Sequence, residues 1–454
     1  MVPPADPAPG LAPGLAYSHI KRAQDLLRAR DAVGARREAE LALQLPPADF
    51  VARNVLGSVL YELGDLHRAR ALFQDVLAES PRYGDALNNL GNILVRDGKP
   101  RAAVEFYERA LAGAPDNPDW CANLGGARQA LGDLPGALEC FDHALALAPG
   151  HADARWNRAL ARLLSGDLAQ GFADYEARWS LPEFIARPFT QPQWTGGDAT
   201  GQTILIHSEQ GYGDTIQMVR FAASLAAHGA RVLLETHAAL APVMRRVSGI
   251  AQVIVHGDPL PAFDAHIPVM SLPHACGVAS LAQIPVPRAY IHAAEGATVT
   301  LPPRRGKERR IGLVWAGRPT HKNDRNRSLD VTLLAPVASV PDVSLVSLQI
   351  GARAGDLAAL PGIVDLAPQL TDFGATARIL EQLDLVVTVD TAVAHLAGAM
   401  GKDCWVMLPF APDWRWLLGR DSSVWYPSLR LYRQPRIGDW TSVVARIVAD
   451  LISR

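Results

Sequence analysis

Residues 84–117, GDALNNLGNILVRDGKPRAAVEFYERALAGAPDN, decide the fold of the first part of the chain. Their pattern returns at a spacing of 34 residues on both sides of this stretch. The recurring positions are a glycine (Gly57, Gly91, Gly125), a second glycine seven residues later (Gly64, Gly98, Gly132, Gly166), an alanine (Ala69, Ala103, Ala137), an aromatic ring (Phe73, Tyr107, Phe141, Tyr175) and a proline (Pro81, Pro115, Pro149). One period in several registers indicates stacked repeats, each burying its apolar face against the next.

Each recurring residue type has a mechanical role in a pair of antiparallel helices. The small residues allow close approach, the ring fills the gap between the helices, and the proline ends the second helix. The pattern closely resembles the tetratricopeptide repeat (TPR) family over residues 15–180. The first unit is degenerate (Ala35, Pro47), and the last full unit has Ala159 for the glycine and Gly171 for the alanine. We expect an α-helical TPR solenoid with a peptide-binding concave groove.

Three asparagines, Asn89, Asn123 and Asn157, also recur at this spacing, just before the first small residue. The TPR arm of the protein O-linked N-acetylglucosamine transferases, which this stretch resembles, carries asparagines at this point as a ladder along its groove. An amide can donate to and accept from an extended peptide backbone without reading its side chains. Alternatively, the asparagines brace neighbouring helices through local hydrogen bonds. The sequence leaves both interpretations open.

Length, net charge and composition limit the classes of protein to which this chain can belong. A chain of 454 residues is long enough for two or three domains, and its net charge of −2 shows no basic excess for nucleic acid or an anionic membrane. Residues 1–14 are rich in Pro, Ala and Gly, and no run of about 18 apolar residues occurs. We expect a disordered tail on a cytoplasmic protein without a transmembrane segment. Four cysteines lack disulfide or zinc-ligand spacing, so no metal site is expected: Cys121, Cys140, Cys276 and Cys404.

The second half of the chain has a different pattern of apolar, proline and glycine residues. Residues 181–202 are rich in Pro and Gly and read as a linker. From Thr203 onward, short apolar strands alternate with helical patterns, which predicts parallel βαβ units. A Pro-rich bridge near residue 300 divides them into two Rossmann-like lobes, residues 203–300 and 301–454. Ligands in such sheets bind at the carboxyl ends of the strands, so we expect the chemistry in a cleft between the lobes.

Three loops at strand ends carry candidate site residues. The first follows the opening strand and contains Gly211, Gly213 and Asp214, where the aspartate serves equally well as a helix N-cap. The second lies at residues 387–395, where a buried strand ends at Asp390 and a helix begins, so that its free amides suit a diphosphate. The third, residues 316–330, gathers Lys322, Arg325 and Arg327, which either neutralise phosphates or form a solvated loop.

The end of the chain is rich in aromatic residues, most of which we expect to serve packing. The stretch 410–427, FAPDWRWLLGRDSSVWYP, follows a strand and carries Asp413, Arg415 and Arg420. It is therefore a candidate wall of the donor pocket. The last segment, residues 440–452, predicts an amphipathic helix that packs back across the lobes.

The segments EQGYGDTIQ (209–217), VWAG (314–317) and DTAVAHLAGAMG (390–401) resemble the bacterial heptosyltransferase-related glycosyltransferases, especially their TPR-fused members, over residues 203–454. This resemblance implies a GT-B fold of two Rossmann-like lobes, a nucleotide-sugar donor with no further cofactor, no catalytic metal, and inversion at the anomeric carbon. It makes Asp214 the base that deprotonates the acceptor hydroxyl, with Glu209 as second choice.

The resemblance also assigns the donor site. Lys322 or Arg327 would hold the donor phosphates, and Asp390 with the amides of Thr391 and Ala392 would bind the donor sugar and diphosphate. His395, one turn further on, either contacts the donor or packs. An inverting transfer needs one carboxylate on the acceptor side and positive charge on the departing diphosphate, and this assignment supplies both.

A repeat arm fused to a transferase suggests a protein acceptor held in the TPR groove, by analogy with the O-linked N-acetylglucosamine transferases and TPR-bearing flagellin glycosyltransferases. The leading hypothesis is therefore a protein glycosyltransferase. The first alternative is a noncatalytic TPR adaptor whose second half is structural or only senses a nucleotide. The second is a transferase for glycan or lipid-linked acceptors that uses its repeats only to recruit partners.

Overall fold

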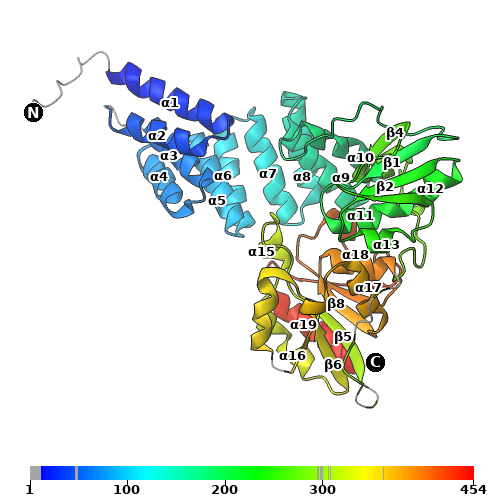
Figure 1. Cartoon of the computed structure of the whole chain (residues 1–454). Coiled ribbons are helices and arrows are strands. Elements are labelled where there is room, and N and C mark those ends of the chain that lie inside the picture. The colour runs from blue at the N-terminus through cyan, green and yellow to red at the C-terminus, as the bar shows by residue number, and fades with distance from the viewer. Residues whose placement is uncertain are drawn as a thin grey trace, which may run out of the picture. The chain divides into compact units, whose positions relative to one another are not determined.

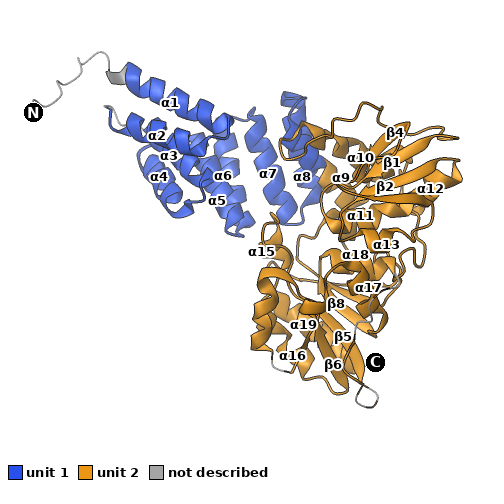
Figure 2. Cartoon of the chain, in the orientation of Figure 1, with its two compact units in different colours: residues 1–158 blue, residues 159–454 orange. Residues whose placement is uncertain are grey.

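The computed structural model describes residues 12–45, 50–293, 296, 300–304, 306, 308–360 and 362–453. These form two compact units, residues 1–158 and 159–454 (Figure 2). The tail expected over residues 1–14 lies outside the described residues up to position 11, and Ala12 begins the first helix. Pro47 of the degenerate first repeat also lies outside them.

The first unit consists of antiparallel helix pairs stacked in chain order (Figure 1). Its helices are α1 (Ala12–Arg28), α2 (Ala32–Leu43), α3 (Phe50–Glu62), α4 (Leu66–Glu79), α5 (Gly84–Arg96), α6 (Pro100–Gly113), α7 (Pro118–Ala130), α8 (Leu134–Leu147) and the first half of α9 (Ala152–Ser165). This arrangement confirms the predicted TPR solenoid.

Close glycine–ring contacts hold the helix pairs α3–α4, α5–α6 and α7–α8 together, as the repeat pattern predicts. A Cβ placed on Gly91 would stand 2.5 Å from the ring of Tyr107, which is almost fully buried. The equivalent contacts join Gly57 to Phe73 and Gly125 to Phe141. Only glycine permits this approach, because any side chain at these positions would displace a buried ring.

The turns after α3, α5 and α7 each have a glycine in the left-handed region, with φ of 84° at Gly64 and 80° at Gly132, whereas the turn after α1 has Arg30 there, with φ of 63°. After Gly64 and Gly132 an aspartate caps the next helix: Asp65 accepts a hydrogen bond from the backbone N–H of Arg68, and Asp133 from that of Gly136. After Gly98 the N-cap is Lys99, whose side chain makes no cap bond. This Gly-Asp pair ends one helix and begins the next within two residues.

The second unit begins within α9, and the last repeat helix, α10 (Leu168–Tyr175), belongs to it together with the short helix η1 (Glu176–Ser180).

Two parallel sheets follow. The first lobe has strands in the order β3-β2-β1-β4: β1 (Thr203–His207), β2 (Arg231–Thr236), β3 (Ile250–Val255) and β4 (Ala265–Pro268). The helix expected between β1 and β2 is divided into α11 (Tyr212–Met218), η2 (Val219–Phe221) and α12 (Ala222–Ala227). Two short helices, α13 (Ala241–Met244) and α14 (Leu272–Ala275), complete the lobe.

The second lobe has six parallel strands in the order β10-β9-β8-β5-β6-β7. They are β5 (Arg309–Val314), β6 (Val343–Ser347), β7 (Val364–Asp365), β8 (Leu385–Val389), β9 (Cys404–Leu408) and β10 (Leu429–Arg433). The helices are α15 (Asp324–Arg327), η5 (Val331–Leu334), α16 (Ala335–Ala338), η6 (Gly351–Ala359), η7 (Ala367–Gln369), α17 (Phe373–Glu381), α18 (Ala392–Ala399), η8 (Trp414–Trp416) and α19 (Trp440–Ile452). These two α/β lobes are consistent with the expected GT-B-like domain.

The C-terminal helix α19 packs onto the sheet of its own lobe. Its apolar face, with Val443 and Ile447 fully buried, joins the core formed by β5, β8 and the helices η5 and α16. The sequence suggested instead that this helix packs back across both lobes. Periodicity gives the width of an apolar face but not the surface that it covers, so this difference could not be foreseen.

Candidate functional site

The predicted site residues lie at the switch points of the two sheets. In the first sheet, β1 lies between β2 and β4, and in the second sheet β5 and β8 are neighbours although they are distant in sequence. Open parallel sheets bind ligands outside the carboxyl ends of the strands where the strand order reverses. The segments that follow these three strands carry Gly211, Gly213 and Asp214 after β1, Lys322 and Arg327 after β5, and Asp390, Thr391, Ala392 and His395 after β8.

Asp214 occupies the third position of helix α11 and reaches back to its N-cap. Its Oδ2 accepts a hydrogen bond from the backbone N–H of Gly211 at 2.6 Å. A carboxylate in the first turn satisfies one free amide and faces the positive end of the helix dipole. The side chain therefore has the capping role considered for it, from inside the helix, and this role uses only one of its oxygens.

The other oxygen of Asp214 is paired with Arg415, a residue of the second lobe. Nη2 of Arg415 contacts Oδ1 of Asp214, while its Nε donates to Oε1 of Gln217 at 2.6 Å. Its Nη1 donates to Oδ1 of Asp413 at 2.9 Å. The side chains of Arg415 and Asp214 are 8% and 18% exposed, so this ion pair between the lobes is largely shielded from water. The sequence placed Arg415 in the wall of the donor pocket and did not identify it as the partner of Asp214.

Burial raises the pKa of Asp214, and the guanidinium of Arg415 and the Gly211 N–H oppose that rise. Burial also lowers the pKa of Arg415, but the Asp413 and Asp214 carboxylates more than offset this and hold the pKa above its ordinary value. The guanidinium therefore stays charged and Asp214 accepts from it as a carboxylate. A buried carboxylate with a raised pKa and one fixed cation is suited to proton transfer.

Gly213 allows helix α11 to pack directly on His395 of α18. A Cβ on Gly213 would stand 2.7 Å from Cδ2 of His395. The imidazole stacks on Trp416, with ring centroids 5.4 Å apart, and its Nδ1 lies 3.0 Å from the hydroxyl of Tyr426. Burial holds the pKa of His395 well below its ordinary value, so the ring is neutral. Of the two roles considered for His395, packing between the lobes is the one that its contacts support.

Asp390 and Thr391 begin helix α18 at the end of β8. Thr391 is the N-cap in an extended conformation, and its hydroxyl lies 3.1 Å from that of Thr388. The pKa of Asp390 is raised to about 6, mainly by burial and secondly by the nearby Asp413 carboxylate. The indole N–H of Trp416 opposes this rise, although its geometry falls short of a hydrogen bond. The amides at this helix start, including that of Ala392, are placed as the sequence predicted, beside a carboxylate that is easily protonated.

The two cations proposed for the donor phosphates differ in their surroundings. Arg327, 14% exposed, donates from Nη1 to the backbone oxygen of Asp390 at 3.1 Å and is paired with Asp324. Lys322 is 90% exposed and pairs with Glu183 of the linker at 2.8 Å. Only Arg327 therefore adjoins the start of α18, and Lys322 has the surroundings of a solvated surface charge.

Glu209, the second choice for the base, is held in a structural ion pair. Its two carboxylate oxygens accept from Nε and Nη2 of Arg178 at 3.1 and 2.8 Å, and Oε1 also accepts from the backbone N–H of Met270. Arg178 is fully buried. Glu209 thus anchors the segment after α10 to the first lobe.

His321 is a residue at this site that the sequence did not single out. Its Nδ1 accepts from the backbone N–H of Asn323 at 3.1 Å, so the neutral ring carries its proton on Nε2. Burial and Arg327 lower its pKa, and the carboxylates of Asp413, Asp324 and Asp214 oppose this. His321 therefore lies within electrostatic reach of Asp214. The sequence gave no pattern that would distinguish this histidine from the other polar residues of its loop as a site residue.

The asparagines of the repeat unit brace one repeat against the previous one. Nδ2 of Asn123 donates to Oδ1 of Asn88 at 2.9 Å, and Nδ2 of Asn89 lies 3.3 Å from Oδ1 of Asn54. These contacts support the bracing interpretation for two of the three asparagines. For Asn157 the corresponding residue of the preceding repeat is Ala122, which has no polar side chain.

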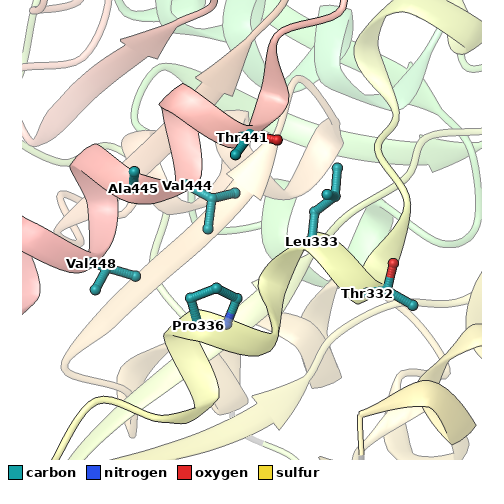
Figure 3. A pocket seen from close by; sticks show the side chains of 7 residues that line it. All are labelled: Thr332, Leu333, Pro336, Thr441, Val444, Ala445 and Val448. Carbon is teal, nitrogen blue, oxygen red and sulfur yellow. The ribbon is translucent and has the colours of Figure 1, made fainter.

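A cavity of about 420 Å³ lies elsewhere on the second lobe, between the η5–α16 segment and α19 (Figure 3). Its lining contains no charged side chain that could hold a phosphate: Thr332, Leu333, Pro336, Thr441, Val444, Ala445 and Val448. We therefore assign no role in donor binding to it. Among the described residues, no group of three or more His, Cys, Asp or Glu side chains is arranged to hold a metal ion, and no helix has the length and apolar character to cross a membrane.

Comparison with known families supports both halves of the architecture. Tetratricopeptide-repeat models match residues 20–81, 54–118 and 94–163. The model of glycosyltransferase family 9 (heptosyltransferase) matches residues 349–404. The chain thus joins TPR repeats to a segment similar to family 9 glycosyltransferases. That segment contains Asp390 to His395, whereas Asp214 and Arg327 lie outside it.

Among curated proteins, the chain is similar to Protein FlbA of Caulobacter vibrioides, with 25% identity over 319 residues, or 63% of this chain and 52% of FlbA. It therefore spans about half the length of this relative. Among solved structures, a thermophilic TPR protein of Thermus thermophilus is 21% identical, with a TM-score of 0.34, and the match covers 37% of this chain and 92% of that one. MamA of Desulfovibrio magneticus is also 21% identical, with a TM-score of 0.29 and coverage of 37% and 93%.

Proposed function

We propose that this protein is a glycosyltransferase that moves a sugar from a nucleotide-sugar donor to an acceptor hydroxyl, on a protein held by the TPR groove. One observation carries the proposal. The candidate base Asp214 and the candidate diphosphate site at α18, which come from different lobes, belong to one polar cluster joined through Arg415 and Asp413. The matched family 9 segment, which contains α18, adds independent support.

The transfer divides the chemistry between the lobes. Asp214 takes the proton of the acceptor hydroxyl as its oxygen attacks the anomeric carbon, and the bond from that carbon to the diphosphate oxygen breaks. The electron pair leaves with the nucleoside diphosphate, whose negative charge is stabilised by Arg327 and by the first amides of α18. Direct attack of this kind inverts the anomeric centre and places no demand on a metal.

Two buried donors at the lobe boundary are suited to an oxygen-rich ligand. Nε2 of Gln217 has no hydrogen-bond partner among the described residues, and Nε1 of Trp416 has only the Asp390 carboxylate nearby, outside hydrogen-bond geometry. A buried donor without an acceptor costs about 1–3 kcal/mol. A sugar or phosphate oxygen placed between the lobes would remove that cost, which favours ligand binding at this surface.

The noncatalytic adaptor remains the second candidate because of one observation. The carboxylates of Asp214, Asp390 and Asp413 are crowded together, and Arg327 is already paired with Asp324. Negative charge of this density weakens the binding of a diphosphate unless a proton is taken up. This charge distribution favours the form of the adaptor hypothesis in which the second half is structural.

The test combines thermal unfolding with a transfer assay on the full chain. We expect one class of nucleotide sugar to raise the melting temperature, since a ligand at about 100 times its Kd stabilises by ~2.7 kcal/mol. With that donor, wild-type protein should release the nucleoside diphosphate in the presence of acceptor protein, and Asp214→Ala should bind the donor without release. Binding with no release by wild type would favour the nucleotide-sensing adaptor, and no binding across the panel would overturn the transferase and favour an adaptor whose second half is structural.

A further inference from the structure

Arg415 connects the two lobes through the residues that surround the candidate base. From η8 in the second lobe it supplies Nη2 to Asp214 and Nε to Gln217. These two acceptors lie three positions apart on α11, so they share one face of that helix. A single guanidinium fork thus contacts the candidate base and the residue one turn beyond it.

The position of Arg415 is itself tightly fixed. The guanidinium carbon lies 4.4 Å from the ring centroid of Trp414, and Asp413 accepts from both the backbone N–H and Nη1 of Arg415. Trp414 packs in turn against Phe172 of α10 and against Trp425. Packing and hydrogen bonds on every side leave the guanidinium little freedom to move.

We infer that Arg415 is a positioning residue for Asp214, and that it acts only while the two lobes are in contact. This inference rests on the proposed function. The Gly211 N–H fixes one oxygen of Asp214 from within the first lobe, and Arg415 fixes the other from the second lobe. Separation of the lobes would leave the carboxylate with its capping bond alone.

The charge state of Asp214 depends on the same contact. Its pKa is raised by burial, and Arg415 is the strongest opposing influence. The other titratable groups that act on it are Asp413, which adds to the rise, and His321, which reduces it. The neutral phenol of Tyr175 is also nearby. Without Arg415, burial and Asp413 would lose their strongest opposition, so the pKa of Asp214 would rise further and less of the side chain would be present as the base at a given pH.

Arg220 provides a matched control, because it is a second buried arginine at the lobe boundary that binds no carboxylate. It donates to the backbone oxygens of Gln217, Pro285 and Trp425 and to the hydroxyl of Tyr290. Replacing it removes buried hydrogen bonds at the lobe boundary but leaves in place the cation that faces Asp214.

The experiment is a carboxyl-carbon NMR titration of Asp214 in the full chain, assigned with Asp214→Asn, for wild type, Arg415→Met, Arg415→Lys and Arg220→Met. Since an adjacent opposite charge shifts a carboxyl by about 1–3 pH units, we expect Arg415→Met to raise the Asp214 midpoint by about that amount and Arg415→Lys to restore part of it. Arg220→Met should leave the midpoint within about 0.5 units of wild type, a small fraction of that shift. Equal midpoints for wild type and Arg415→Met would overturn the inference.

A transfer assay with the donor found by thermal unfolding separates this inference from the proposed function. We expect the acid limb of the kcat profile to move to higher pH in Arg415→Met and to return part of the way in Arg415→Lys. Turnover by Asp214→Ala at the wild-type rate would refute the proposed function whatever the titration shows. Loss of turnover in Asp214→Ala together with an unmoved limb in Arg415→Met would refute only the role of Arg415.

Discussion

The backbone of Gly213 lies directly against the imidazole of His395, so closely that a Cβ at this glycine would stand 2.7 Å from Cδ2 of the ring. The ring has no room to withdraw, because it is 5% exposed and held by Trp416 and Tyr426. We expect Gly213→Ala to destabilise the second unit by about 1–3 kcal/mol, the usual cost of overpacking a well-filled interior.

Urea unfolding measures this effect, and Gly355→Ala is the control. A Cβ at Gly355 meets nothing within 4 Å, so this variant should differ from wild type by less than about 0.5 kcal/mol. Similar unfolding midpoints for the two variants would show that α11 and α18 can separate without cost.

Two adjacent glycines of α7 should respond in opposite directions to the same substitution. A Cβ at Gly125 would stand 2.6 Å from the buried ring of Phe141, whereas one at Gly126 meets nothing within 4 Å. Gly125→Ala should therefore lower the free energy of unfolding of the repeat unit by about 1–3 kcal/mol. Gly126→Ala should raise it by about 0.5–1 kcal/mol, because alanine loses less backbone entropy in a helix. Circular dichroism during thermal unfolding distinguishes the two, and a stabilising Gly125→Ala would contradict the repeat packing.

The bracing role of the asparagines predicts that replacing them lowers the free energy of unfolding by unequal amounts. Asn123→Ala leaves the buried Oδ1 of Asn88 without its donor, which should cost about 1–2 kcal/mol. Asn157→Ala should cost less, since Ala122 offers its side chain no polar partner. If denaturant unfolding shows equal losses, these asparagines do not owe their stabilising effect to the contact between repeats.

Removing the charge of Asp390 should stabilise the protein at high pH and not at low pH. The pKa of this group is raised by burial to about 6, above its ordinary value, so the ionised form is disfavoured in the folded state. The stability that it contributes is present below its unfolded pKa and is lost as the pH rises through about 6. Asp390→Asn should therefore exceed wild type by roughly 1–3 kcal/mol at pH 8 and by much less at pH 4. A pH-independent difference in melting temperature would count against a buried, titrating Asp390.

The two candidate phosphate ligands should differ in their effect on nucleotide binding. Arg327 adjoins the start of α18, and a hydrogen bond to a charged group is worth ~1.5–3 kcal/mol, so Arg327→Gln should weaken binding about tenfold or more. Lys322→Gln removes an exposed charge and should weaken binding less than about threefold. Isothermal titration with the nucleotide identified by thermal unfolding provides the comparison. A larger loss for Lys322→Gln would reassign the phosphate ligand.

Periodic features of this chain were predictable because they repeat. Gly91 facing Tyr107 follows from a spacing that occurs several times, and each occurrence reports the same local packing. The positions of strands β1, β2, β3, β5, β6, β8 and β9 were likewise visible, because buried parallel strands are continuous apolar runs. Strands β4 and β7, with four and two residues, were missed because they carry too little pattern. Strand β10 was missed because Arg430 and Arg433 interrupt its apolar residues.

Contacts at the site were harder to predict, because they join segments far apart in the sequence. Arg415 and Asp214 are separated by 201 positions, and nothing in either segment specifies that they pair. A sequence pattern can state that a carboxylate begins a helix, but the cation that sets its charge comes from the other lobe. The same reasoning explains why Glu209 resembled a candidate base until Arg178 was seen to hold it.

The attachment of α10 and η1 to the second unit determines how this protein can be recombined with others. Arg178, fully buried, is bonded to Glu209 and Ser271, and Tyr175 donates from its hydroxyl to Gln210. In a chimera joined after Trp179, a foreign helix would replace Arg178. Glu209 would then carry a buried charge without its partner. Exchange of repeat arms between such proteins is expected to succeed when the junction lies near residue 158, so that the final helix travels with the α/β lobes.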